Sequence, residues 1–164
     1  MQEARIALLQ QMPIFGGIRE ETLGFLLALS PVVFVRKGDF FFREGDAADS
    51  MFVLEEGKVA VLKSWRAEES LLHYLGRGDC FGEMALMDLQ PRSAAVRAVE
   101  PCSAIQLSAA SLYQLYEKDL EQFTLIQMNM GREVCRRLRE TDERLFRTQM
   151  GAGPGGVEGV FRAT

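Results

Sequence analysis

Short turns built around glycine constrain the fold of this chain more than any other feature. A charged residue followed by Gly-Asp occurs three times, at 37–39, 44–46 and 77–79, and Glu56-Gly57-Lys58 is a near relative. Glycine supplies the positive φ that tight turns require. The segments between these turns are short, and no long helical pattern interrupts them.

Those short segments have the composition of strands. From Val32 to Tyr74, β-branched and aromatic residues come in short, partly alternating runs, as in half-buried strands. Several short strands with turns roughly every 8 to 12 residues are typical of all-β folds. The pattern therefore predicts an antiparallel β-roll, or jelly-roll barrel, rather than a parallel sheet.

Helical periodicity flanks the β-rich region on both sides. Apolar spacing predicts two N-terminal helices, over Glu3–Gln11 and Arg19–Leu29. The pattern becomes helical again from Ser108 to Met150, with a break expected near Glu117 to Asp119. The fold class is thus α+β, mainly β, with helices at both ends of the roll.

The domain organisation follows from these patterns. With 164 residues, 48% of them apolar, the chain can bury one core without disulfides or metal. We expect one domain over 1–147 and a flexible Gly-rich tail over 148–164. Within the domain we assign N-terminal helices to 1–30, the β-roll to 31–107 and C-terminal helices to 108–147.

Charge and cysteine content exclude several classes of partner. The net charge of −4 provides no basic field for nucleic acid. Cys80, Cys102 and Cys135 match neither a disulfide framework nor zinc-site spacing, which suits a reducing cytoplasm. No secretion signal begins the chain, and the apolar stretch Leu23–Val35 contains Pro31 and is shorter than the roughly 20 residues of a membrane span. We expect a cytoplasmic protein with no membrane partner.

The connection Phe81–Ala98 is unusual for a β protein and predicts a ligand site. Gly82 lets the backbone approach a ligand, and residues 83–87 can form one helical turn whose free amides point at an anion. The guanidinium of Arg92, followed by small residues, suits phosphate. The carboxylate of Glu83 would repel phosphate unless it bound another group, such as sugar hydroxyls. Together these side chains indicate a nucleotide.

The order Phe-Gly-Glu, an apolar helical turn and then Pro-Arg-small-Ala resembles the phosphate-binding cassette of cyclic-nucleotide-binding domains. The resemblance covers about residues 12–147, and Gly45 and Gly57 stand at the turns of that family. It implies a β-roll that binds a 3′,5′-cyclic nucleotide as ligand, without a cofactor or metal. The likeness extends to the sensor domains of bacterial catabolite activators and to regulatory subunits of cyclic-AMP-dependent protein kinase.

The resemblance also implies a role for each cassette residue. Glu83 would accept a hydrogen bond from the ribose 2′-hydroxyl, and Arg92 would pair with the phosphate oxygens. The remaining phosphate contacts would come from Gly82 and the amides of Met84, Ala85, Ser93 or Ala94. In this family Thr after the cassette Arg accompanies cyclic GMP, whereas Ala or Ser is usual with cyclic AMP. Ser93 therefore favours cyclic AMP.

The C-terminal helix carries a second likeness. Residues 136–141, Arg-Arg-Leu-Arg-Glu-Thr, resemble the helix of the catabolite activators, in which the Thr meets adenine. Thr141 would take that role, although Asp142 stands where those proteins carry a Ser that reaches the partner's ligand. An apolar stripe on this helix indicates packing, and the resemblance implies a homodimer; its members are Met130, Val134, Leu138 and Leu145.

Other classes of function remain as alternatives. The first is a structural or protein-interaction domain that keeps the β-roll without nucleotide, in which Arg92 and Glu83 form a solvated ion pair. An enzyme is disfavoured, because no nucleophile with an adjacent base and no metal constellation is evident. A DNA-binding unit is not expected, since only 17 residues follow Arg147. The sequence identifies no downstream protein partner.

Overall fold

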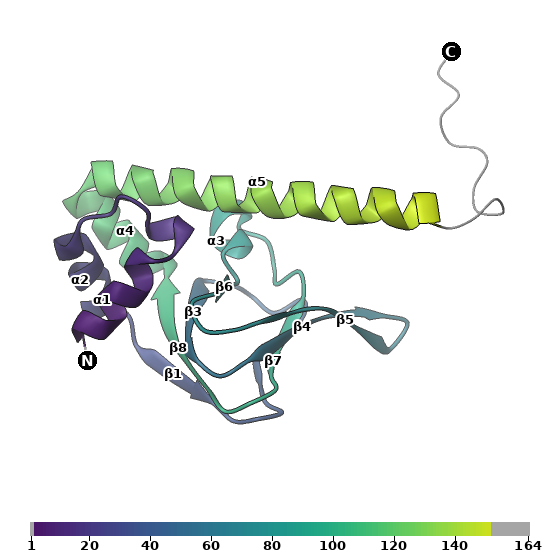
Figure 1. The fold of residues 1–164 in the computed structure, drawn as a ribbon. Helices are drawn as coiled ribbons and strands as arrows, with labels where there is room; N and C mark the ends of the chain where they lie inside the picture. The colour runs from purple at the N-terminus through teal and green to yellow at the C-terminus, as the bar shows by residue number, and fades with distance from the viewer. Residues whose placement is uncertain (1, 152–164) are drawn as a thin grey trace, which may run out of the picture. The chain divides into compact units, whose positions relative to one another are not determined.

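The computed structural model of the chain describes residues 2–151 and shows the predicted order of helices, strands and helices (Figure 1). Helices flank the strands at both ends of the chain, and one short helix interrupts them. The helices are α1 (Gln2–Gln10), the 3-10 helix η1 (Pro13–Phe15), α2 (Glu20–Ala28), α3 (Met84–Asp88), α4 (Ala109–Lys118) and α5 (Leu120–Gly151). The break expected near Asp119 is confirmed.

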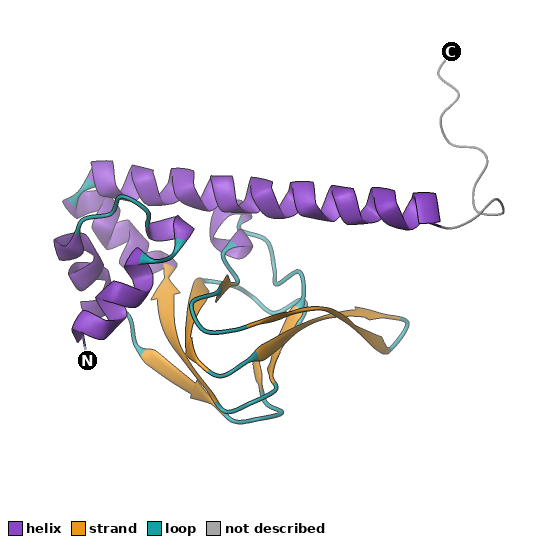
Figure 2. Cartoon of the chain, in the orientation of Figure 1, coloured by secondary structure: helices purple, strands orange, loops and turns teal. Residues whose placement is uncertain are grey.

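The strands form two four-stranded antiparallel sheets, with the orders β1-β8-β3-β6 and β2-β7-β4-β5 (Figure 2). Their bounds are β1 (Val32–Val35), β2 (Phe40–Phe42), β3 (Ser50–Glu56), β4 (Val59–Trp65), β5 (Glu68–Leu75), β6 (Cys80–Phe81), β7 (Ala95–Ala98) and β8 (Cys102–Ser108). Strands distant in sequence pair with each other, as β1 does with β8. The predicted antiparallel β-roll is confirmed.

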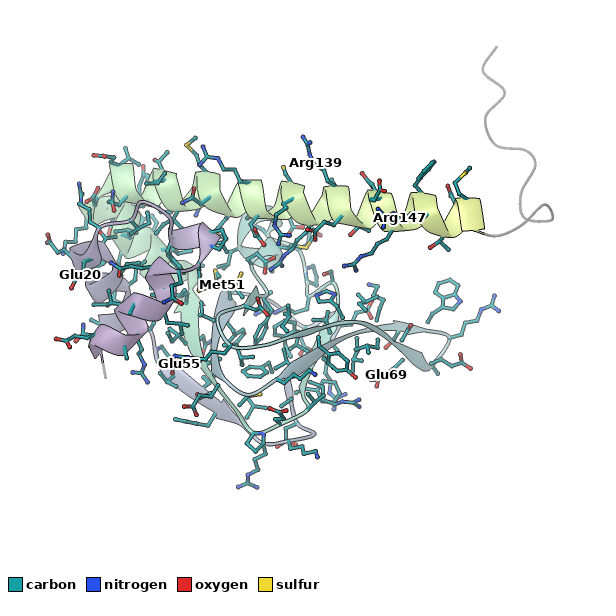
Figure 3. The ribbon with its side chains drawn as sticks, in the orientation of Figure 1. Glu20, Met51, Glu55, Glu69, Arg139 and Arg147 are labelled. Carbon is teal, nitrogen blue, oxygen red and sulfur yellow. The ribbon has the colours of Figure 1, made fainter. Side chains whose placement is uncertain are left out.

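The first hydrophobic core joins the N-terminal helices to one sheet. Leu9, Leu23 and Leu26 of α1 and α2 are fully buried against strand residues such as Met51 of β3, which Figure 3 labels, and Ile105 of β8. Helix α4 and the start of α5 contribute to the same core. Burying side chains of this size provides most of the favourable free energy of folding.

The second core fills the roll itself and contains a cluster of phenylalanine rings. The rings of Phe41, Phe42, Phe52 and Phe81 contact one another with centroids 5.0–6.1 Å apart. Such edge-on and stacked pairs add to the stability gained from burial alone. Because Phe81 is the last residue of β6, this cluster fixes the point at which the segment 81–98 leaves the sheet.

The chain divides into two compact units, Met1–Met130 and Gly131–Thr164, and the boundary between them lies within α5. In the first unit, the Asn129 side chain donates to the carbonyls of Ile14 and Gly16, at 3.1 and 2.9 Å. No helix within residues 2–151 is both long enough and apolar enough to cross a membrane.

The predicted start of the tail at residue 148 is wrong, because helix α5 continues to Gly151. Residues 148–151 are helical rather than part of a tail, and the rest of that prediction, 152–164, lies outside the described residues. Ion pairs one turn apart support this end of α5, because Arg147 Nε donates to Glu143 at 2.9 Å. Thr148 also donates its hydroxyl to the Arg144 carbonyl at 2.9 Å.

The turns predicted from glycine are confirmed, since Gly38, Gly45, Gly57 and Gly78 have φ between +85° and +91°. Gly57 has a second constraint. A Cβ atom at this position would lie 2.4 Å from the Pro101 carbonyl oxygen and 2.7 Å from Cys102 Sγ, whereas a Cβ at Gly38 would meet nothing within 4 Å. Gly57 is thus required by both φ and space, and Gly38 by φ alone.

We expect Gly57→Ala to destabilise the fold more than Gly38→Ala. Positive φ costs an alanine about 1–2 kcal/mol at either site, and the clash with Pro101 adds about 1–3 kcal/mol at Gly57 only. Urea unfolding of both variants measures the two losses. Equal losses would show that the loop around Pro101 moves aside freely.

Candidate functional site

The segment 81–98 adopts the local structure that its sequence predicts. Strand β6 ends at Phe81, Gly82 has φ +82°, and Glu83 precedes the five-residue helix α3. Leu89 then takes a left-handed conformation, with φ +57°, which ends α3. The chain continues to β7, so the predicted helical turn lies between two strands of different sheets.

Gly82 brings the backbone against the side chain of Arg92. The Gly82 carbonyl accepts a hydrogen bond from Arg92 Nη1 at 3.1 Å. A Cβ atom on residue 82 would lie 2.5 Å from that same Nη1 and 3.3 Å from the Ser50 carbonyl oxygen. Only glycine combines this approach with the positive φ.

The guanidinium of Arg92 is buried inside the roll, with 6% of the residue exposed. Besides Gly82, its Nη2 contacts Ser50 Oγ at 3.5 Å, and its central carbon lies 4.0 Å from the centroid of the Phe42 ring. The Nε atom is buried and has no hydrogen-bond partner. A buried polar atom is almost always paired, so this donor indicates a site for an acceptor.

Electrostatics at Arg92 support the same conclusion. Burial lowers the pKa of the guanidinium, and the negative charges of Asp49, Asp46 and Glu83 oppose that shift only in part. The protein therefore compensates the buried cation incompletely. An anion placed against Nε would supply both the missing acceptor and the missing charge.

The other cassette residues lie along the same segment. Glu83 is 2% exposed and close enough for its charge to act on Arg92. Ala85 is buried and Met84 is exposed at the start of α3, where the first amides of a helix have no partner within it. Ser93 is exposed and Ala94 half-buried. Their individual roles toward a ligand stay predictions.

The main chain of Arg92 is held by the turn that follows β2. The Gly45 amide donates to the Arg92 carbonyl at 2.8 Å, and the Arg92 amide donates to the Asp46 carbonyl at 2.9 Å. This pair of hydrogen bonds fixes the residue on both sides, as in a strand pair. The turn thereby determines where the Arg92 side chain enters the roll.

Three residues near the site could not be predicted from the sequence: Phe42, Ser50 and Lys63. Phe42 and Ser50 contact the guanidinium, and Lys63 donates to the Ser93 carbonyl. The only signal in the sequence is the alternation of strand residues, which assigns faces but not partners. These contacts join residues 30 to 50 positions apart, so they depend on strand pairing.

Thr141 belongs to the second compact unit. Its hydroxyl donates to the Arg137 carbonyl at 2.9 Å, four residues earlier on α5. Its contact with a ligand therefore stays a prediction. Among residues 2–151, no cluster of three or more His, Cys, Asp and Glu side chains could hold a metal ion.

Comparison with known proteins identifies the family. A sequence model of the cyclic nucleotide-binding domain matches residues 32–119. The cyclic AMP receptor protein of Thermus thermophilus is 30% identical over 131 residues, which is 79% of this chain and 59% of that protein. The cGMP-dependent protein kinase, isozyme 1, of Drosophila melanogaster is 30% identical over 82% of this chain and 19% of that protein. The chain thus spans less than two thirds of either relative.

Solved structures agree in fold. The Thermus thermophilus catabolite activator protein superposes with a TM-score of 0.72 at 30% identity, over 81% of this chain and 61% of that one. The regulatory domain of Toxoplasma gondii PKA, crystallised with cAMP, gives 0.66 at 26% identity, over 69% and 43%. A cyclic nucleotide-binding domain from Methylobacillus flagellatus gives 0.80 over 98% and 86%, and at 22% identity it supports the fold alone.

Three features therefore agree: the antiparallel roll, a buried arginine with an unpaired donor in the segment 81–98, and the match over residues 32–119. Neither the roll nor the arginine alone would be specific, but the family match includes both. The chain belongs to the cyclic nucleotide-binding domain family.

Proposed function

We propose that this chain is a non-catalytic sensor that binds cyclic AMP in preference to cyclic GMP. The observation that carries the proposal is the buried Nε of Arg92, which has no hydrogen-bond partner. A cyclic phosphate offers two acceptor oxygens and one negative charge, which match a guanidinium donating through Nε and Nη. The carboxylate of Glu83, buried nearby, would then accept from the ribose 2′-hydroxyl.

The preference for cyclic AMP rests on Ser93. This residue is exposed directly after Arg92, where the family resemblance associates threonine with cyclic GMP. Adenine lacks the exocyclic amino group of guanine at position 2, so a threonine at residue 93 would not increase the affinity for cyclic AMP. Thr141 would contribute to the adenine contact from α5.

The sensor would act through α5 on a partner. A ligand shifts an equilibrium between two conformations only if it binds one of them more tightly, and we propose that contact with α5 supplies this difference. Leu138 and Leu145, seven residues apart on this helix, are 59% and 57% exposed. We propose that they form the seam of a homodimer. A nucleotide-free interaction domain is the alternative.

Arg92→Ala should weaken the binding of cyclic AMP by about 100-fold or more, because the phosphate loses charge-assisted hydrogen bonds worth about 3 kcal/mol in total. Isothermal titration of wild type and variant measures the change. Arg97→Ala is the matched control: it removes the same charge from β7, where Arg97 pairs with Glu69 at 3.6 Å. Affinity equal to wild type in Arg92→Ala would refute the site, and absence of binding in the wild type would favour the interaction domain.

Ser93→Thr should shift the preference toward cyclic GMP. The added methyl group is tolerated because residue 93 is exposed, and it restricts χ1, so that the hydroxyl, which serine also carries, would be held toward the guanine amino group. We expect the ratio of the two dissociation constants to change by about tenfold, the value of one good hydrogen bond. Parallel titrations with both nucleotides measure it. A ratio that does not change would mean that base selection lies elsewhere.

The double variant Leu138→Glu with Leu145→Glu should be monomeric, because charges would replace the apolar seam. Arg147→Glu is the control: Arg147 is labelled in Figure 3, and its separation from Leu138 along α5 puts the two residues on opposite sides of an α-helix. Light scattering at micromolar concentration distinguishes monomer from dimer. A monomeric wild type would contradict the seam, and so would a dimeric double variant.

A further inference from the structure

Lys63, near the end of β4, connects three segments around the proposed phosphate site. Its ammonium group donates to the Glu44 carboxylate and to the Ser93 carbonyl. The second carboxylate oxygen of Glu44 accepts from the Ser64 amide at 3.1 Å. A single lysine thus joins β4, the turn after β2 and the end of the cassette.

The Glu44 side of this bridge is anchored independently of Lys63. Glu44 begins the turn whose next two residues, Gly45 and Asp46, bind the main chain of Arg92 at 2.8 and 2.9 Å. Hydrogen bonds from Lys63 and from the Ser64 amide lower the pKa of the Glu44 carboxyl. Glu44 therefore stays ionised at neutral pH and holds the ammonium group in place. Its own position depends on the same turn that positions Arg92.

The Ser93 side of the bridge fixes the orientation of a peptide plane. In a planar trans peptide, the carbonyl of residue 93 and the amide N–H of residue 94 point in opposite directions. Because Lys63 holds the Ser93 carbonyl, the Ala94 N–H must point away from Lys63. The Ala94 amide is one of the donors expected to complete the phosphate site. Lys63 therefore controls the direction of a donor that it does not contact.

We propose that Lys63 is a positioning residue for phosphate binding, with Glu44 as its counter-ion. It acts by holding the Ser93–Ala94 peptide in the orientation that presents the Ala94 amide to the ligand. This inference rests on the proposed function, since it concerns how the same site holds a cyclic phosphate. A surface ion pair by itself contributes little to stability. Its effect is therefore expected in affinity rather than in the free energy of unfolding.

Lys63→Met should weaken the binding of cyclic AMP by about tenfold, because one charge-assisted hydrogen bond is no longer aligned. Lys58→Met is the matched control. It also removes an exposed lysine beside β4, but the Lys58 ammonium lies over the Tyr74 ring, 4.5 Å from its centroid. The two variants lose the same charge, so a general loss of attraction for the anion would weaken both equally. Isothermal titration of both, with thermal unfolding of both, measures the effect.

A second readout separates positioning from a general structural role. The two diastereomeric phosphorothioates of cyclic AMP each replace one phosphate oxygen by sulfur, a weaker acceptor. We expect the wild type to bind one diastereomer less tightly because its sulfur faces the Ala94 amide. We call the ratio of the dissociation constants of the two diastereomers the sulfur penalty. In Lys63→Met this ratio should fall at least threefold. A purely structural defect would weaken the binding of cyclic AMP and of both analogues by the same factor.

The outcomes distinguish this inference from the proposed function. A wild type that does not bind cyclic AMP overturns the proposed function. A wild type that binds, together with Lys63→Met of equal affinity and unchanged sulfur penalty, overturns only the role of Lys63. If Lys63→Met does not fold, Glu44→Gln takes its place: it keeps Lys63 but removes the counter-ion, and we expect about threefold weaker binding with a reduced sulfur penalty. Unchanged values in that variant also overturn the inference.

Discussion

The burial of the Arg92 guanidinium is the interaction on which the site depends. Removing a cation from water costs several kcal/mol unless partners compensate it, and a whole domain is stable by only about 5–15 kcal/mol. The roll compensates Arg92 in part, through the Gly82 carbonyl, the Phe42 ring and Ser50. In the proposed function, an anion bound at this position would recover the cost that remains. Ligand binding and fold stability would then be coupled through a single side chain.

The surroundings of Arg92 hold its backbone and leave little space around its side chain. The main chain of Arg92 is paired on both sides with the turn at Gly45 and Asp46, and Gly82 leaves no space for a Cβ atom. The four clustered phenylalanine rings fix the strands from which these segments extend. A guanidinium held in one geometry loses little entropy on binding, which is the advantage of a preorganised site.

The sequence allowed the prediction of features that depend on neighbouring residues. Glycine turns, helical periodicity and the order of cassette residues are local, and the turns, α1, α2 and the β-roll were predicted from them. Contacts that depend on strand register could not be predicted. Ser50 reaches Arg92 only because β3 and the cassette meet in the folded roll, 42 residues apart in sequence. Helix α5 continues past the predicted boundary to Gly151, and the Thr148 hydroxyl donates to the Arg144 carbonyl in this last stretch.

Helix α5 is long, and glycine gives it an intrinsic weak point. Asp119 caps its start, accepting from the Gln122 amide at 3.1 Å, and Asn129 binds it to the segment around Ile14. The next residue but one, Gly131, begins the second compact unit. Glycine inside a helix costs about 1 kcal/mol relative to alanine, so the helix is intrinsically weakest where its anchored part ends.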